Sequence, residues 1–99
     1  MLYAIVAEDV ANSTEKRKAA RPAHLKRIEQ LVADGRVVVA GPFPAIDSPD
    51  PGPSGVAGSL IVAEFDSIED ARAWIDADPH VTQGVFARVS VKPFLKTVP

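Results

Sequence analysis

The stretch RKAARPAHLKRIEQLV, residues 17–32, has the residue spacing of an amphipathic helix, and the remaining chain can be placed around it. At about 100° per residue, one stripe of this helix contains five side chains: Arg17, Arg21, His24, Ile28 and Leu31. Leu25 and Val32 widen this stripe. The N-terminal half of the stripe is basic and the C-terminal half is apolar. We therefore expect the helix to run from the mouth of a cleft into a packed core, with His24 at the transition.

Strand and helix signals on both sides of this stretch predict the fold. Runs rich in strand-forming residues lie at 2–7, 36–40, 59–65 and 85–92. Ser67 is expected to cap a second helix, which ends at Asp78-Pro79. The order strand, helix, strand, strand, helix, strand predicts a ferredoxin-like α+β fold in one domain, 1–99, with two helices on one face of a four-stranded antiparallel sheet. The bare sheet face predicts a homodimer.

Three local signals predict how the elements begin and end. Asn12 to Glu15 have the spacing of a capping box, so a helix should begin there. Pro22 predicts a kink near residues 19–21, because proline inside a helix removes a hydrogen bond. From Gly41 to Gly58 the chain is expected to be a loop, since five of the nine prolines lie in it. The loop, residues 42–57, is either a cover for a site or a surface excursion stiffened by proline.

Composition excludes several classes of site and partner. The 99 residues include no cysteine and two histidines, which excludes thiolate metal sites and thiol nucleophiles and argues against a histidine-rich metal site. A formal net charge of −2 argues against general binding to nucleic acid or anionic membranes. No apolar run is long enough to span a bilayer. We expect a cytoplasmic protein with neither a metal nor an organic cofactor.

A histidine needs a partner acid to act as an oriented base. Asp78 is the first candidate partner of His24, because the proline after it fixes its backbone; Asp9 and Asp47 follow. Each of these residues also has a structural interpretation: His24 as a core-edge histidine bonded to a carbonyl, and Asp78 as a turn residue. His80 is expected to be a loop side chain that fills or lines space.

The chain resembles the YciI-like (YCII-related) family along nearly its whole length. The resemblance rests on six pieces: residues 3–9, YAIVAED; 17–25, RKAARPAHL; 41–42, GP; 58–59, GS; 78–79, DP; and 91–94, VKPF. It implies a ferredoxin-like fold that dimerises through its sheets into an α+β barrel. It also implies a catalytic pair, His24 and Asp78, in a pocket lined by Arg17, Arg21, Pro42 and Ser59.

The same resemblance implies a function. The family includes a dehydrochlorinase that acts on a chlorinated hydroxyquinol, and its relatives include muconolactone isomerases and aromatic cyclases. We therefore expect a lyase or isomerase that transfers a proton on a small, oxygenated substrate. The alternative is a module that binds or senses a small metabolite without chemistry. An RNA-binding sheet is disfavoured, because the predicted central strands offer only Phe65 as a stacking aromatic.

Overall fold

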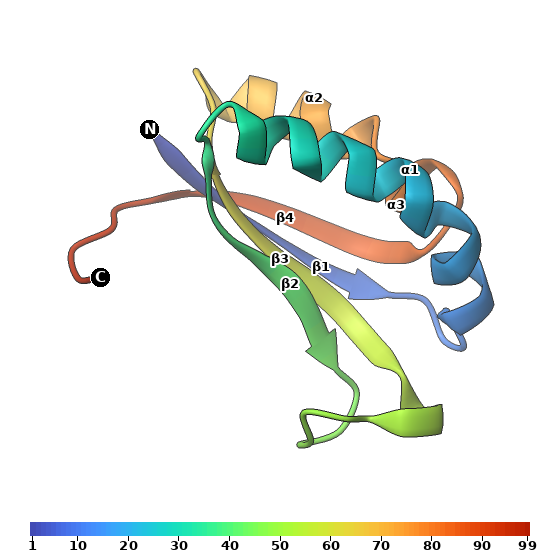
Figure 1. Cartoon of the computed structure of the whole chain (residues 1–99). Coiled ribbons are helices and arrows are strands. Elements are labelled where there is room, and N and C mark those ends of the chain that lie inside the picture. The colour runs from blue at the N-terminus through green and yellow to red at the C-terminus, as the bar shows by residue number, and fades with distance from the viewer.

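The computed structural model describes residues 1–99 and has the predicted ferredoxin-like order. Its elements are β1 (Leu2–Asp9), α1 (Thr14–Ala33), β2 (Val37–Pro44), the 3-10 turn η1 (Gly52–Ser54), β3 (Val56–Glu64), α2 (Ile68–Asp76), α3 (Pro79–Thr82) and β4 (Phe86–Phe94). The four strands form one antiparallel sheet in the order β2-β3-β1-β4. All helices lie on one face of the sheet (Figure 1), which confirms the predicted α+β architecture.

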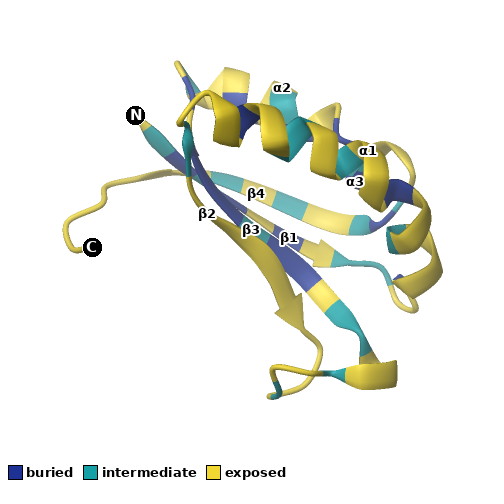
Figure 2. Cartoon of the chain, in the orientation of Figure 1, coloured by how far each residue is buried: buried dark blue, intermediate teal, exposed yellow.

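The core lies between the helices and one face of the central strands. Ile5 of β1 is opposite Ile61 of β3 and Val91 of β4, so these three side chains share the helix-facing side. Leu31 of α1 and Ile75 of α2 complete this core from above. Burial therefore concentrates on the middle strands and on the inner side of the helices (Figure 2), as the apolar half of the α1 stripe requires.

The helix α1 runs without interruption from Thr14 to Ala33, so Pro22 does not break it as the sequence suggested. Pro22 lies inside the helix and faces solvent. Its missing N–H leaves the carbonyl of Lys18 without a helical partner, and water can bond to that carbonyl at an exposed position. At the far end of α1, Val32 is 56% exposed. The apolar stripe is therefore narrower than predicted, and Val32 does not belong to the core.

The predicted capping box does not form. Ser13 is the N-cap of α1 but makes no side-chain cap bond; its hydroxyl instead donates to Asp9 Oδ2 at 2.6 Å. Asn12 takes a left-handed turn conformation with φ of 56°. The other predicted cap is confirmed, since Ser67 Oγ accepts a hydrogen bond from the backbone of Asp70 at 3.1 Å.

The strands β2 and β3 are longer than the sequence predicts, and the loop between them is shorter. Gly41 and Pro42 do not end β2, which continues to Pro44. Proline is tolerated there because β2 is an edge strand and needs no N–H on its open side. The hairpin consequently extends beyond the rest of the sheet (Figure 1), and the connection covers only residues 45–55. None of the helices combines the length and apolar character needed to cross a bilayer.

Candidate active site

The centre of the candidate site is a hydrogen bond between His24 of α1 and Asp78, the residue before α3. His24 Nδ1 lies 2.8 Å from Asp78 Oδ2. The Asp78 side chain is fully buried, and that of His24 is 14% exposed. A carboxylate only accepts hydrogen bonds, so the bond assigns a proton to Nδ1, and in the neutral ring Nε2 then has a free lone pair.

Local sequence holds Asp78 in place. The buried Ile75 anchors the end of α2, which ends at Asp76 and not at the predicted Asp78-Pro79 boundary. Asp78 is extended, as proline at the next position favours, and it is the N-cap of α3. Its Oδ2 accepts a bond from the backbone N–H of His80 at 2.9 Å. The carboxylate therefore has little freedom to move away from His24.

Arg27, one turn after His24 on α1, holds the other carboxylate oxygen. Its NH1 donates to Asp78 Oδ1 at 2.9 Å, and its guanidinium lies 4.5 Å from the centroid of the Trp74 ring. Burial by itself raises the pKa of the Asp78 carboxyl, but the hydrogen bonds from His24 and His80 outweigh it, so that pKa lies well below its ordinary value. Asp78 is thus a permanent anion near neutral pH.

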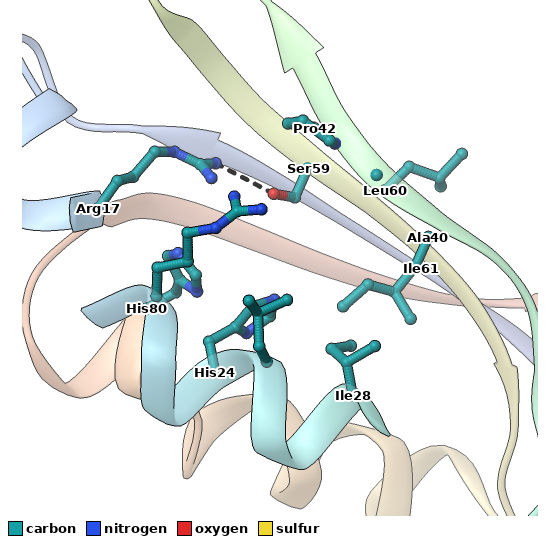
Figure 3. A pocket seen from close by; sticks show the side chains of 12 residues that line it. Arg17, His24, Ile28, Ala40, Pro42, Ser59, Leu60, Ile61 and His80 are labelled. Carbon is teal, nitrogen blue, oxygen red and sulfur yellow. Dashed lines mark hydrogen bonds between the residues drawn. The ribbon is translucent and has the colours of Figure 1, made fainter. Parts of the chain in front are cut away.

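A cavity of about 190 Å³ opens beside the His24 ring, between α1 and the strands β2 and β3 (Figure 3). Its lining combines polar side chains at one end with apolar ones at the other: Arg17, Arg21, His24, Leu25, Ile28, Ala40, Gly41, Pro42, Ser59, Leu60, Ile61 and His80. This is the cleft that the change of character along the α1 stripe predicts. Its size fits a small molecule of one ring.

The two predicted arginines have different environments. Arg17 forms a bidentate ion pair with Asp9, through Nε to Oδ2 and through NH2 to Oδ1 at 2.9 Å. The same NH2 donates to Ser59 Oγ at 3.0 Å (Figure 3). It also lies 3.0 Å from the carbonyl oxygen of Gly58, to which it donates. Arg17 is therefore neutralised and fixed in the cavity wall, while the positive charge of Arg21 has no ion pair.

The structure brings most of the predicted site residues together. Asp78 lies behind His24 and is bonded to it. The other five line the cavity: Arg17, Arg21, His24, Pro42 and Ser59. Their catalytic and binding roles stay a prediction. Asp9, a second candidate partner for His24, binds Arg17 instead, and Asp47 is exposed in the hairpin loop.

The sequence did not identify Arg27, and it predicted His80 only as a loop side chain that fills or lines space. Arg27 follows His24 by three residues, which places both on one side of the helix, and this spacing could have identified it. His80 is buried in α3 and not in a loop, with its ring edge-on to that of His24 at a centroid distance of 4.0 Å. Nothing in the spacing of Asp78, Pro79 and His80 predicts that contact.

One cluster has the donor types of a metal site. His24, Asp78 and His80 offer ligand atoms that lie within 4.8 Å of one another. Two imidazoles and a carboxylate suit zinc and related ions. Arg27 on the same carboxylate places a positive charge against any cation bound there. The expectation of a metal-free site therefore stays a prediction, and the charge of Arg27 favours it.

Comparison with known proteins gives a consistent result. The family model of the YCII-related domain matches residues 1–95. The chain is 57% identical over 96 residues to Protein YciI of Escherichia coli O6:H1, covering 97% of this chain and 98% of that one. It is 47% identical over 96 residues to an uncharacterized protein of Haemophilus influenzae, with the same coverage.

A solved structure is similar over nearly the same length. It is 5-chloro-2-hydroxyhydroquinone dehydrochlorinase, TftG, from Burkholderia phenoliruptrix AC1100, in complex with 2,5-dihydroxybenzoquinone. The TM-score is 0.85 at 26% sequence identity, with 96% of this chain and 94% of that chain covered.

Proposed function

This chain belongs to the YCII-related family, and we propose that it is an enzyme that transfers a proton on a small, oxygenated substrate without a cofactor. The reaction would be of the lyase type, such as dehydrohalogenation, or of the isomerase type. One observation carries the proposal: His24 is bonded through Nδ1 to a buried carboxylate, and its ring borders a cavity. The similarity to TftG supports a small-molecule substrate that is aromatic or enolic.

The proposed mechanism assigns one role to each group. His24 Nε2 takes a proton from the substrate, and the imidazolium that forms is stabilised by the carboxylate of Asp78, 2.8 Å from Nδ1. Negative charge develops on a substrate oxygen as the proton leaves. Arg21, the cavity-lining arginine without an ion pair, would stabilise that charge. Arg17, Pro42 and Ser59 shape the wall against which the substrate packs.

The proposal is tested by turnover and not by binding alone. Hydroxylated and chlorinated aromatics and lactones are screened by thermal shift, because a ligand of the native state raises its melting temperature. Hits are then assayed for loss of halide or for exchange of a proton with deuterated solvent. His24→Gln should lower the rate about 10²- to 10⁴-fold, since that is the usual contribution of a general base.

A matched control is available on the same helix. Lys26→Ala changes an exposed residue of α1 that does not line the cavity, so turnover should stay within about twofold of the native rate. Full turnover in the His24 variant contradicts the proposal. Ligand binding without any exchange, in the native protein, favours the alternative function, a module that binds a small anionic metabolite. The free charge of Arg21 is the feature that would suit such a module.

We further propose that residues 1–99 form one domain that acts as a cytoplasmic homodimer. The sheet face away from the helices carries exposed apolar side chains, among them Val6, Val39 and Phe43. Val39 is 50% exposed and lies opposite Val62, on the side away from the core. Val39→Glu should shift the chain from dimer to monomer in light scattering, whereas Lys26→Ala, on the exposed side of α1, should not. A native protein that is monomeric at all concentrations contradicts the homodimer.

A further inference from the structure

His80 is a buried histidine in contact with His24, Asp78 and Phe86. It is 2% exposed, and its ring stacks on Phe86 at a centroid distance of 5.2 Å and an interplanar angle of 16°. Its edge-on contact with His24, at 4.0 Å between centroids, places the two imidazoles side by side. His80 therefore cannot be treated as a surface histidine of the short helix α3.

The polar atoms of His80 are incompletely satisfied. Its Nδ1 is the one buried side-chain nitrogen or oxygen in the chain without a hydrogen-bond partner, although Asp78 Oδ2 lies only 3.4 Å away. That oxygen already accepts bonds from His24 Nδ1 and from the His80 backbone, which use both of its lone pairs. The contact of Nδ1 with the carboxylate is therefore electrostatic and not a formed hydrogen bond.

The neighbouring carboxylate decides which ring nitrogen of His80 carries the proton. A lone pair on Nδ1 would face a negative oxygen at 3.4 Å, whereas an N–H at the same position would be attracted to it. The neutral ring should therefore be the Nδ1–H tautomer, like that of His24. The lone pair of each ring is then on Nε2.

The Nε2 atom of His80 has a route to the ligand. His80 lines the main cavity and also a neighbouring hollow of about 150 Å³, both of which include Arg17 and Arg21 in their walls. Nε2 makes no hydrogen bond and is not among the fully buried atoms without a partner, so it keeps a small accessible surface although the side chain is only 3% exposed. Two imidazole acceptors thus border one small cavity, with a free guanidinium nearby.

We propose that His80 is a second ligand-contacting imidazole, whose Nε2 accepts a hydrogen bond from a hydroxyl group of the ligand while His24 receives the transferred proton. This inference rests on the proposed function and narrows its substrate class to a small ring with two hydroxyl groups. One hydroxyl group gives its proton to His24 and keeps the negative charge on its oxygen, and the other donates a hydrogen bond to His80. The contact of the two rings at 4.0 Å places the two acceptors close enough to reach both groups of the same molecule.

The tautomer can be measured without any ligand. The chain has two histidines, so nitrogen-15 NMR of the imidazoles contains two ring systems, and His80→Phe assigns them. Both rings should show a protonated Nδ1 and an unprotonated Nε2 at a pH well above the ordinary pKa of a histidine side chain, about 6.5. A protonated Nε2 on His80 would overturn the inference, because that atom could then not accept a bond.

The second test compares ligands that differ by one hydroxyl group. The three dihydroxybenzenes and phenol are titrated into the native protein, followed by NMR. The best dihydroxybenzene should bind about tenfold more tightly than phenol, the usual effect of one added hydrogen bond. This ratio should fall to about one in His80→Phe, which keeps the stacking on Phe86, and should recover in His80→Gln, whose terminal amide can place an oxygen near the position of Nε2.

The outcomes separate this inference from the proposed function. An unchanged ratio in His80→Phe, with turnover still dependent on His24, overturns the role of His80 and leaves the proposed function in place. No preference for two hydroxyl groups in the native protein overturns the narrower substrate class. If His80→Phe fails to fold, His24→Gln assigns the two rings instead, and a protonated Nε2 on His80 in the native protein still overturns the inference.

Discussion

Replacing Asp78 with asparagine should destabilise the protein in a way that depends on pH. Asparagine keeps the shape of the side chain and one acceptor oxygen, which can still serve the His80 N–H and His24. The amide nitrogen then faces Arg27 NH1, which donates to Asp78 Oδ1 at 2.9 Å in the native protein. Two donors meet, and the charge-assisted bond and the charge of the carboxylate are both lost.

The size of the effect follows from these contacts. Breaking a buried ion pair by removing one partner costs about 3–5 kcal/mol. The Arg27 side chain is 26% exposed and rests on Trp74, so part of its charge can be hydrated, and we expect about 2–4 kcal/mol in the free energy of unfolding. For a chain of this size, a loss of about 3 kcal/mol lowers the melting temperature by roughly 12–24 °C.

The pH dependence has a definite sign. The pKa of Asp78 is lower in the folded protein than in the unfolded chain, where it is near the ordinary value of about 3.9. The carboxylate therefore stabilises the fold fully above that value, and the contribution is lost as the pH falls through the folded pKa. The difference in unfolding free energy between native protein and Asp78→Asn should be large at pH 7 and should shrink below about pH 4.

The assay is urea unfolding at several pH values and at one fixed protein concentration, because association would add a concentration-dependent term. Asp76→Asn is the matched control. Asp76 pairs with Arg72 at 3.2 Å, but both side chains are about half exposed, so the change should be under about 1 kcal/mol. Equal stability of Asp78→Asn and the native protein at pH 7, or a difference that does not change between pH 7 and pH 3, would refute this account of the carboxylate.

Three further substitutions test the supports of the site, each by urea unfolding. Arg17→Lys removes the bidentate ion pair with Asp9 and should lower the free energy of unfolding by about 1–3 kcal/mol; a loss below about 0.5 kcal/mol would mean that the bidentate geometry is not needed. Gly58→Ala should cost about 2–3 kcal/mol, because its Cβ would overlap the carbonyl oxygen of Ala7, whereas Gly41→Ala meets open space and should be nearly neutral; equal effects would be contrary to this packing. Ser67→Ala should cost about 1 kcal/mol through the lost cap of α2, and an unchanged free energy of unfolding would argue against that bond.

The fold could be predicted from sequence because its signals are local and repeated. Apolar runs marked the strands, and Ser67 marked the start of α2 with the correct cap. The errors fall where long-range contacts override a local signal. Pro22 sits inside α1 because residues before and after it are both fixed, Arg17 by Asp9 and His24 by Asp78. Pro42 does not end β2 because β2 pairs with another strand on one side only, and no N–H is needed on its open side.

The capping box failed for the same kind of reason. The spacing of Asn12 and Glu15 is correct for a cap, but the Ser13 hydroxyl has a stronger acceptor in the carboxylate of Asp9. Asp9 in turn is held by the two nitrogens of Arg17. A polar network that links β1 to the first turn of α1 therefore replaces a local motif, and no pattern within the helix reveals it.

The same contrast explains which parts of the site could be predicted. The periodicity of α1 put Arg17, Arg21 and His24 on one side, because helical spacing is a local property. The partner of His24 depends on where Asp78 lies after the chain has crossed the sheet, and three carboxylates were open to that role until the fold was known. Arg27 and His80 complete the surroundings of Asp78 from two different elements. Since the carboxylate of Asp78 contacts His24, Arg27 and His80, its position is the long-range feature on which the geometry of the site depends.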